Sequence, residues 1–287
     1  MYESLAEKAK RVRFNIVRST GAAGSGHPGG SLSATDILVT LYFAQMRHDP
    51  TNPRWPNRDR FVLSKGHAAP ALYSTLAEAG YFDPETLSGL RKLGNRLQGH
   101  PSTVTGLPGL EASTGSLGQG LSISVGMALS ARLDCADWRV YAVLGDGECQ
   151  EGMIWEAAMA AAHYHLGNLT AILDRNRLQI DGPTDSVMGL EPLADKWRSF
   201  GWDVQEVDGH DHGQLLRALQ QATGIVKPGW EIEGVKPAAD RNEMPHMIIA
   251  HTVKGRGVSF MENEVKWHGE AAKGELLERA MKELKCS

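Results

Sequence analysis

Residues 140–147 read Val-Tyr-Ala-Val-Leu-Gly-Asp-Gly, and this stretch decides the fold class. An unbroken apolar run, without alternating polar residues, predicts a strand that is covered on both faces, as strands of parallel sheets are. Gly145-Asp146-Gly147 follows at once and predicts a turn at the carboxyl end of that strand. An alanine-rich helix is expected next, over residues 153–164, so the local order is strand, turn and helix.

The same alternation continues on both sides of this stretch. Further buried strands are expected at residues 60–64, 169–173, 203–207 and 247–251. Helices are expected at residues 3–20, 33–46, 69–80, 117–133, 213–222 and 270–285, and loops at residues 21–30, 49–60 and 96–111. Strands that alternate with helices predict an α/β fold: a doubly wound, mostly parallel sheet with helices on both faces.

Length and composition indicate one ordinary globular domain. The 287 residues fit one large α/β domain better than two small ones, so residues 1–287 are expected to form a single domain. Residues 224–245 are rich in Pro, Gly and charge and are expected to form a surface excursion from it. The net charge of −4, without any Lys/Arg block, argues against a nucleic-acid partner.

Neither a membrane segment nor a disulfide framework is expected. No apolar run reaches the roughly 18 residues that a membrane span needs, and Met1 to Arg13 lacks the apolar segment of a signal peptide. The three cysteines (Cys135, Cys149 and Cys286) have neither CxxC nor metal-ligand spacing. They indicate free thiols in a reducing compartment, so a cytoplasmic location is expected.

Asp146 and Asn176 each follow a predicted buried strand. Neighbouring parallel strands would bring them side by side at the carboxyl ends, where such sheets bind their ligands. Carboxylate and amide oxygens are hard ligands that magnesium favours, with phosphate oxygens and water completing its shell. Gly145 and Gly147 let the backbone approach a phosphate. Taken alone, however, an ordinary β-turn and a surface Asn explain these residues better.

A wider pattern reverses that conclusion. Residues 145–152 (Gly-Asp-Gly-Glu-Cys-Gln-Glu-Gly) and 173–179 (Leu-Asp-Arg-Asn-Arg-Leu-Gln) resemble the thiamine diphosphate motif of the transketolase family. Other matching segments follow in order: Gly26-His-Pro-Gly-Gly30, Leu63-Ser-Lys-Gly-His67, Gly99-His-Pro101, Thr114-Gly-Ser-Leu-Gly-Gln-Gly120, Glu206-Val-Asp-Gly-His210 and Thr252-Val-Lys-Gly-Arg-Gly257. The resemblance covers nearly the whole chain, and several ordered matches arise by chance far more rarely than one.

The resemblance implies a thiamine diphosphate-binding fold and a set of cofactor ligands. Asp146, Asn176 and the carbonyl group of Leu178 would bind Mg²⁺, for which Ca²⁺ or Mn²⁺ can substitute. The residues that would contact thiamine diphosphate itself are His67, Gly115, Ser116, Leu117, Asp146, Gly147, Asn176 and His268. The spacing around His268, in Lys266-Trp-His-Gly269, differs from the family pattern.

Catalytic roles are implied for His27, His67 and His100. In a transketolase the thiazolium ylid of the cofactor attacks a ketose carbonyl, and a hydroxyl proton leaves as the carbon–carbon bond breaks. Neutral imidazole can donate and accept protons near working pH and can stabilise charge that develops on oxygen. A lone His beside Gly-Pro is more often a loop residue, but three within matching segments favour the functional interpretation. Surface or packing roles are expected for other histidines: His163, His165, His210, His212, His246 and His251.

Glu151 has two interpretations. By the resemblance it would act in catalysis, through a hydrogen bond across a subunit interface to the glutamate that activates the pyrimidine. It also fits a first-turn helix glutamate that the helix dipole favours. Both hold if the carboxylate faces the interface.

Full-length transketolases carry two further domains, which supply the activating glutamate and much of the grip on the sugar phosphate. The predicted helix at residues 270–285 leaves no room for another α/β domain of typical size. The resemblance therefore implies a partner: a C-terminal transketolase subunit with the pyrimidine-binding domain and the activating glutamate, in a heterotetramer. The alternative is that the sequence is a fragment of a longer protein.

The predicted function is transfer of a two-carbon ketol unit from a ketose phosphate to an aldose phosphate, as in the pentose phosphate pathway. Alternatives are a split transketolase for an unusual sugar, such as apulose phosphate or a sulfonated ketose, and a 1-deoxyxylulose-5-phosphate synthase-like enzyme. A non-catalytic, cofactor-binding scaffold would be expected to lack the magnesium ligands or the histidines, and all of them are present. A dinucleotide-dependent dehydrogenase is disfavoured because no Gly-x-Gly-x-x-Gly follows the first strand.

Overall fold

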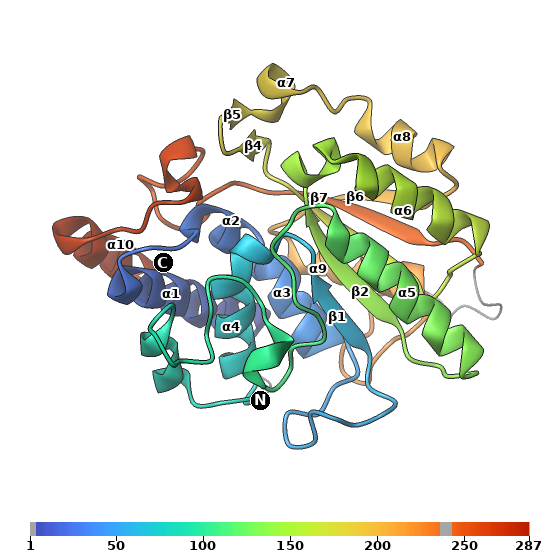
Figure 1. Ribbon diagram of the computed structural model, residues 1–287, viewed down its shortest axis with the longest axis horizontal. Helices are drawn as coiled ribbons and strands as arrows, with labels where there is room; N and C mark the ends of the chain where they lie inside the picture. The colour runs from blue at the N-terminus through green and yellow to red at the C-terminus, as the bar shows by residue number, and fades with distance from the viewer. Residues whose placement is uncertain (1–3, 236–242, 287) are drawn as a thin grey trace.

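The computed structural model describes residues 4–235 and 243–286, and Figure 1 shows a central sheet between layers of helices. Within those residues, the sheet has the strand order β1-β2-β3-β7-β6, and each neighbouring pair is parallel. The strands are β1 (Arg60–Leu63), β2 (Val140–Gly145), β3 (Leu169–Arg175), β6 (Asp203–Asp208) and β7 (His246–His251). The expected doubly wound α/β fold is confirmed.

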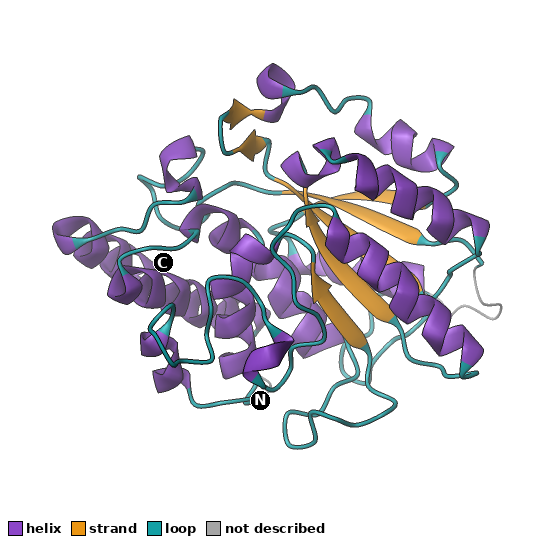
Figure 2. Ribbon diagram, in the orientation of Figure 1, coloured by secondary structure: helices purple, strands orange, loops and turns teal. Residues whose placement is uncertain are grey.

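Helices cover both faces of the sheet (Figure 2). One face borders an apolar core shared by α1 (Leu5–Ala23), α3 (Thr35–Thr40), α4 (Ala69–Glu78), α9 (His212–Thr223) and α10 (Gly274–Cys286), of which α10 packs against α1. The other face packs against α5 (Gln119–Leu133), α6 (Gly152–His163) and α8 (Leu193–Ser199). Successive residues of β2 belong to alternate cores, with Tyr141 and Val143 in the first and Val140, Ala142 and Leu144 in the second. This two-sided burial explains why β2 has no polar alternation.

The crossovers explain where a ligand can bind. The chain passes from β1 to β2, β3 and then β6. The helices that directly precede β2, β3 and β6 are α5, α6 and α8, and all three lie on the same face of the sheet. It then returns to β7 through α9 on the other face, as right-handed crossovers require when the direction reverses. At the carboxyl ends, the chain leaves β1 and β7 toward α4 and α10, but leaves β2 and β3 toward α6 and α8. Diverging loops of this kind leave a ligand crevice.

Two elements expected within the first fifty residues were wrong. The loop expected at residues 21–30 contains the end of α1, which stops at Gly24 in the left-handed region (φ 65°), and the start of α2 (Pro28–Ser33). The single helix expected at residues 33–46 is instead the end of α2, then α3 and a π-helical turn η1 (Leu41–Gln45). The break follows Ser33, whose hydroxyl donates a hydrogen bond to Asp174 on β3, 2.5 Å away. This long-range contact leaves no trace in local periodicity.

Several short elements were not predicted, because each is shorter than the window in which periodicity can be recognised. They comprise the hairpin β4 (Leu178–Gln179) and β5 (Gly182–Pro183), the helices α7 (Thr184–Val187) and α8, and the 3₁₀ turns η2 (Gly66–Ala68), η3 (Pro84–Gly89), η4 (Thr103–Thr105), η5 (Gly147–Gln150) and η6 (Val265–His268). The expected terminal helix begins at Gly274 rather than residue 270.

The surface excursion expected at residues 224–245 carries neither helix nor strand in its described parts, 224–235 and 243–245. Its residues 236–242 lie outside the described part of the chain, as does residue 3, the first of the helix expected at residues 3–20. Cys135 is exposed and Cys149 buried, and both are free thiols, whereas the side chain of Cys286 lies outside the description. Among the described helices, none combines the length and the apolar character that crossing a bilayer requires.

Candidate active site

A pocket of about 250 Å³ lies at the carboxyl ends of β1, β2 and β3. Many of the residues predicted from the sequence line it: His67, Leu117, Asp146, Gly147, Glu151, Asn176, Leu178 and His268. These residues come from separate parts of the chain, so the fold gathers them at the crevice that the crossovers create.

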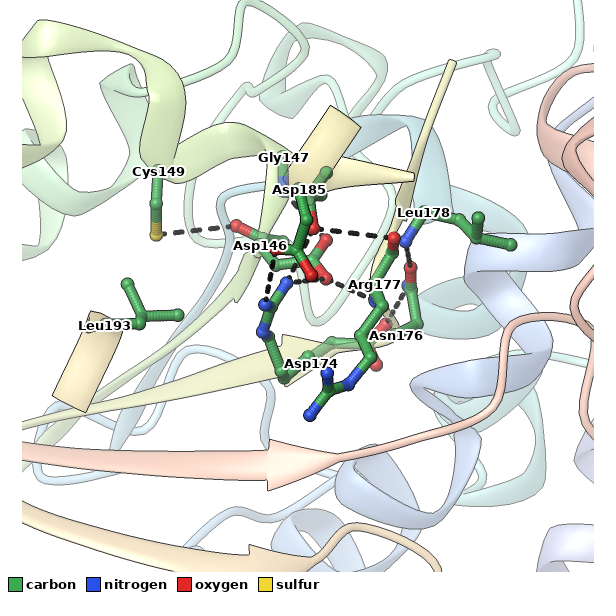
Figure 3. Close-up of polar contacts among 12 residues, drawn as sticks. Asp146, Gly147, Cys149, Asp174, Asn176, Arg177, Leu178, Asp185 and Leu193 are labelled. Carbon is green, nitrogen blue, oxygen red and sulfur yellow. Dashed lines mark hydrogen bonds and ion pairs between the residues drawn. The ribbon is translucent and has the colours of Figure 1, made fainter. Parts of the chain in front are cut away.

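Asp146 and Asn176 lie beside each other because β2 and β3 are neighbours in register, with Gly145 opposite Asp174 (Figure 3). The Asp146 Oδ1 atom accepts a hydrogen bond from the Gly147 N–H at 2.7 Å. Its Oδ2 atom accepts from the Arg175 guanidinium at 3.1 Å and from the Arg177 N–H. These donors fix the rotamer of the Asp146 carboxylate at the carboxyl end of β2.

The amide of Asn176 is oriented by its partners. Its Nδ2 atom lies 3.3 Å from both Ser33 Oγ and Asp174 Oδ2, and its Oδ1 atom accepts from the Leu178 N–H at 3.2 Å. A nearby carboxylate can only accept, so the nitrogen must face Asp174 and the oxygen must face away from it. Arg177 has a left-handed backbone (φ 66°), which turns the chain sharply between Asn176 and Leu178.

This donor set fits a hard divalent cation. It offers a carboxylate, an amide oxygen and a backbone carbonyl, which are the oxygen ligands that Mg²⁺ takes together with phosphate and water. Among the described residues, no group of three His, Cys, Asp or Glu side chains is arranged to hold a metal ion, so the mixed oxygen set is what supports the fit. Burial, reinforced by the charge of Asp174, raises the pKa of Asp146. A cation would offset this cost of keeping the carboxylate ionised.

Two buried lysines face the same pocket, and the sequence did not single them out. Lys65 and Lys254 are each 1% exposed. Lys65 Nζ donates to the Gly30 carbonyl at 2.9 Å and forms an ion pair with Asp174. Lys254 Nζ donates to the Leu178 carbonyl at 2.9 Å, and burial, with the charge of Lys65, lowers its pKa to about 8. Both lie in matching segments that follow strands, and that position was the available signal.

Four histidines from four distant segments meet beside the lysines. The ring centroid of His27 lies 5.2 Å from that of His67, 5.6 Å from that of His268 and 6.3 Å from that of His100. The rings of His67 and His268 stack with centroids 5.1 Å apart. His268 therefore belongs to the cluster, a point that the local spacing of the sequence left open.

The environment keeps these imidazoles neutral at physiological pH. Burial, followed by the charges of Arg91, His100 and Lys254, lowers the pKa of His27 to about 4. Burial, followed by Lys254, lowers the pKa of His268 to about 3. The pKa values of His67 and His100 are also lowered, primarily by loss of solvent. The Nδ1 atom of His27 is buried and has no protein hydrogen-bond partner in the described structure.

The loop before α5 contributes backbone to the site. A Cβ atom on Gly115 would lie 3.1 Å from ring atoms of His100, so glycine is needed for this close approach. Leu117 reaches the pocket, whereas the adjacent Ser116 is exposed and does not line it. Gly118, left-handed at φ 86°, donates its N–H to the buried Glu148 carboxylate at 3.0 Å.

Glu148 is a further residue that the sequence did not single out. Besides Gly118, its carboxylate accepts from the Gly145 N–H at 3.0 Å and from Ser64 Oγ. It thus joins three loops, those at the carboxyl ends of β1 and β2 and the loop before α5. Nothing in the local sequence indicated that Glu148 would be buried, because a Glu directly after Gly-Asp-Gly is equally consistent with an exposed turn.

Glu151 stands at the outer edge of the pocket. It is the N-cap of α6, one position before the first turn in which it was expected, and its exposed side chain makes no capping hydrogen bond. The carboxylate satisfies no N–H of the helix, but its charge at the N-terminus is still of the sign that the helix dipole favours. The side chain is left facing outward beside the pocket.

Arg175 connects the Asp146 carboxylate to the segment after β5. Its side chain is 1% exposed and also binds Thr184 Oγ1 at 2.8 Å and Glu191 at 2.8 Å. A buried guanidinium with several acceptors is a rigid support, because each of its N–H groups fixes a different partner.

The chain is similar to one protein family along nearly its whole length. Residues 5–285 match the family described as transketolase, thiamine diphosphate binding domain. The chain is 43% identical to one of the subunits of the apulose-4-phosphate transketolase of Phocaeicola vulgatus, over 98% of this chain and 94% of that protein. It is 44% identical to the SqwG subunit of the 6-deoxy-6-sulfo-D-fructose transketolase of a Clostridium species, over 98% of this chain and 96% of that protein.

Longer proteins match as well, over part of their length. Human transketolase is 40% identical over 98% of this chain, which covers 42% of the human protein. The crystal structure of Campylobacter jejuni transketolase superposes with a TM-score of 0.84 at 33% identity, and 98% of this chain covers 42% of it. A Pichia stipitis transketolase structure gives 0.87 at 31% identity, with 98% of this chain and 41% of that one covered. The chain thus spans about two fifths of these longer relatives.

Proposed function

This chain belongs to the transketolase family and carries the family's thiamine diphosphate-binding domain; from this premise we propose that it is the diphosphate-binding subunit of a two-chain transketolase. The complete enzyme would transfer a two-carbon ketol unit from a ketose phosphate to an aldose phosphate. One observation carries the proposal: the oxygen ligands, the two buried lysines, His67 and His268 line a single pocket, and the rings of His27 and His100 lie beside these histidines.

The chain's own residues divide the work of binding. Asp146, Asn176 and the Leu178 carbonyl would hold Mg²⁺, with Ca²⁺ or Mn²⁺ as substitutes. Lys254, His67 and His268 line the same pocket; Lys254 would compensate diphosphate charge, and the neutral imidazoles would offer hydrogen bonds. Gly147 keeps the backbone accessible, because a Cβ atom there would lie 2.8 Å from that of Gln179. Gly115, Ser116 and Leu117 would approach the aminopyrimidine from the loop before α5.

When bound, thiamine diphosphate supplies the nucleophilic carbon that attacks a ketose carbonyl. His27 and His100 would face the sugar, and their lowered pKa values favour the neutral form that can accept a hydroxyl proton. A ring nitrogen of His27 would bind the substrate oxygen or hold that proton. His67 and His268, stacked between the lysines and His27, would keep water out of the reacting region.

A second polypeptide would complete the site. We expect a C-terminal transketolase subunit with the pyrimidine-binding domain and the activating glutamate, to which Glu151 would donate or accept a hydrogen bond in a heterotetramer. Apolar side chains are exposed on α6, which begins beside Glu151 (Met153 and Met159), and on the segment that follows β3 (Ile180, which lines the pocket, and Met188). Gln150 donates a hydrogen bond to the Met188 carbonyl at 2.7 Å, which joins the two groups. Apolar surface of this kind is typical of a protein interface.

The proposed function has two candidate substrate classes: the common ketose phosphates and an unusual sugar. The relatives of matching length are named for apulose-4-phosphate and for 6-deoxy-6-sulfo-D-fructose, which favours a dedicated transketolase for an unusual sugar as the second candidate. Groups that grip the distal end of the sugar would come from the partner. A 1-deoxyxylulose-5-phosphate synthase-like activity ranks lower, because none of these relatives is named for it. The expected location is the cytoplasm, where sugar phosphates are formed.

The test is reconstitution. The chain is produced with and without its C-terminal partner, and ketol transfer is measured with common ketose phosphates, apulose phosphate and a sulfonated ketose, with Mg²⁺ and thiamine diphosphate. Transfer by the two-chain complex and none by the chain alone would support the proposal. Robust transfer by this chain in verified absence of a second polypeptide, or no cofactor binding by the complex, would overturn it.

A further inference from the structure

His210, which follows β6, was assigned no role from the sequence, yet both nitrogens of its ring are engaged. Its Nδ1 atom lies 2.7 Å from Asp36 Oδ2, and its Nε2 atom lies 2.9 Å from the backbone nitrogen of Val253. A backbone N–H can only donate, so Nε2 must be the acceptor and Nδ1 must carry the proton that is donated to Asp36. The two partners together determine the tautomer.

Asp36, on α3, holds His210 from the side of the core. It is 3% exposed and also pairs with Arg13 on α1, while His212 Nε2 lies 3.4 Å from its Oδ1 atom. Burial alone would raise the pKa of Asp36, but the hydrogen bond from His210 and the charge of Arg13 lower it to about 2. An ionised, anchored acceptor therefore orients the imidazole.

Val253 lies in the segment 252–255, which leaves β7 and passes the pocket. Thr252 Oγ1 donates to Asp174, the carboxylate that orients the Asn176 amide. Lys254 Nζ reaches the Leu178 carbonyl at 2.9 Å and His268 Nδ1 at 2.8 Å. The N–H that His210 accepts thus lies between the two side chains through which this segment reaches the pocket.

We propose that His210, oriented by Asp36, is a positioning residue that fixes the backbone of segment 252–255 and so directs Lys254 into the pocket. His210 does not itself line the pocket, and it acts through one backbone hydrogen bond. One part of this proposal rests on the proposed function of the pocket: the expectation that correct placement of Lys254 tightens the binding of a diphosphate. The effect on the placement of Lys254 follows from the geometry alone.

Three substitutions separate the bonds involved. His210→Asn places an amide N–H near the position of Nδ1 and keeps the bond to Asp36, but leaves the Val253 N–H without its acceptor. His210→Gln places an amide oxygen near the position of Nε2 and keeps that acceptor. His246→Asn is the matched control, because His246 also pairs with an aspartate (Asp203, 3.1 Å) and is buried at the opposite end of β7.

The first measurement is the rate at which acetic anhydride labels Lys254 in the full chain, followed by peptide mass spectrometry with Lys65 as an internal reference. Lys254 is protected in the folded protein because it is 1% exposed. His210→Asn is expected to raise its labelling rate about tenfold relative to Lys65, since loss of one buried hydrogen bond corresponds to roughly that factor. His210→Gln and His246→Asn are expected to label at the wild-type rate.

The second measurement is the Kd for thiamine diphosphate with Mg²⁺ in the two-chain complex, with the melting temperature of each variant. A Kd for His210→Asn that is weaker by roughly tenfold, largely restored in His210→Gln, supports the proposal. Wild-type labelling in His210→Asn overturns it, as does equal loss in His210→Asn and His246→Asn in proportion to stability. A wild-type complex that binds no cofactor while Lys254 labelling still responds to His210→Asn refutes the proposed function but supports the positioning role.

Discussion

Lys254 Nζ donates a hydrogen bond to His268 Nδ1 across 2.8 Å, and the charge of the lysine helps to lower the pKa of the histidine. An ammonium group can donate only to an unprotonated ring nitrogen, and the same contact opposes a second positive charge on the imidazole. The residue that had the least certain place in the sequence is thereby tied to a buried cation of the pocket.

A pH dependence of stability follows from this pair. Above about pH 6.5 the imidazole of His268 is neutral in both the folded and the unfolded chain, so it does not make the free energy of unfolding depend on pH. Between that pH and about 3 the unfolded chain takes up a proton that the folded chain does not, so the free energy of unfolding falls as pH falls. His268→Asn keeps an acceptor for Lys254 without titrating. Urea unfolding at about pH 7 and about pH 5 should show a smaller loss for this variant than for wild type. Equal losses would contradict the lowered pKa of His268.

Substitution of Asp146 tests the metal site. Asp146→Ala removes a buried carboxylate from the proposed oxygen set, and loss of an ionic ligand should weaken Mg²⁺-dependent binding of thiamine diphosphate by about tenfold or more. Asp185→Asn is the control, because Asp185 is a carboxylate on the other side of Arg175, 3.5 Å from it and largely exposed. Calorimetric titration of the two-chain complex at several Mg²⁺ concentrations measures both. Unchanged binding by Asp146→Ala would exclude the metal role.

Arg175 gives a prediction about stability. Its side chain is 1% exposed and compensates the buried Asp146 carboxylate. Arg175→Met leaves that charge without its cation, and breaking a buried ion pair costs about 3–5 kcal/mol in unfolding free energy. Magnesium and thiamine diphosphate should restore part of the loss, because the metal supplies a new counter-charge to Asp146. Thermal unfolding with and without both additives is the measurement. The account would be contradicted by an Arg175→Met variant with the melting temperature of wild type. It would also be contradicted if the additives raised the melting temperature of the variant less than that of wild type.

The apolar surface beside Glu151 predicts where the partner docks. Met153→Glu adds a charge to α6 next to the pocket, and burying an unpaired charge in an interface is costly. The chain alone should fold normally, while the two-chain complex should dissociate at concentrations at which wild type remains assembled. Leu276→Glu on α10 is a matched control, since Met153 and Leu276 are each 40% exposed. Light scattering after size-exclusion chromatography reports the assembly. Loss of assembly in the control but not in Met153→Glu would place the interface elsewhere.

Sequence periodicity determined the fold class and placed Asp146 and Asn176 at the same edge of the sheet. The uninterrupted apolar run of β2 is the direct consequence of burial on both faces, and it required a parallel sheet covered by helices. Asp146 and Asn176 could be placed together because each follows such a strand, and parallel neighbours end at the same edge. Matching segments then brought His27, His67 and His100 into the same hypothesis.

Only the tertiary structure decided which groups meet across the crevice. Local pattern indicates where each strand ends, but the order β3-β7-β6, in which the chain skips a place and returns, cannot be read from it. That order brings segment 252–255 next to β3, so that Lys254 reaches Leu178 and Thr252 reaches Asp174. The roles of Lys65, Glu148 and His210 depend in the same way on partners distant in the chain. The physical reason is that periodicity reports which face of an element is buried, whereas the partner of a buried charge or hydrogen bond is set by the packing of whole elements against one another.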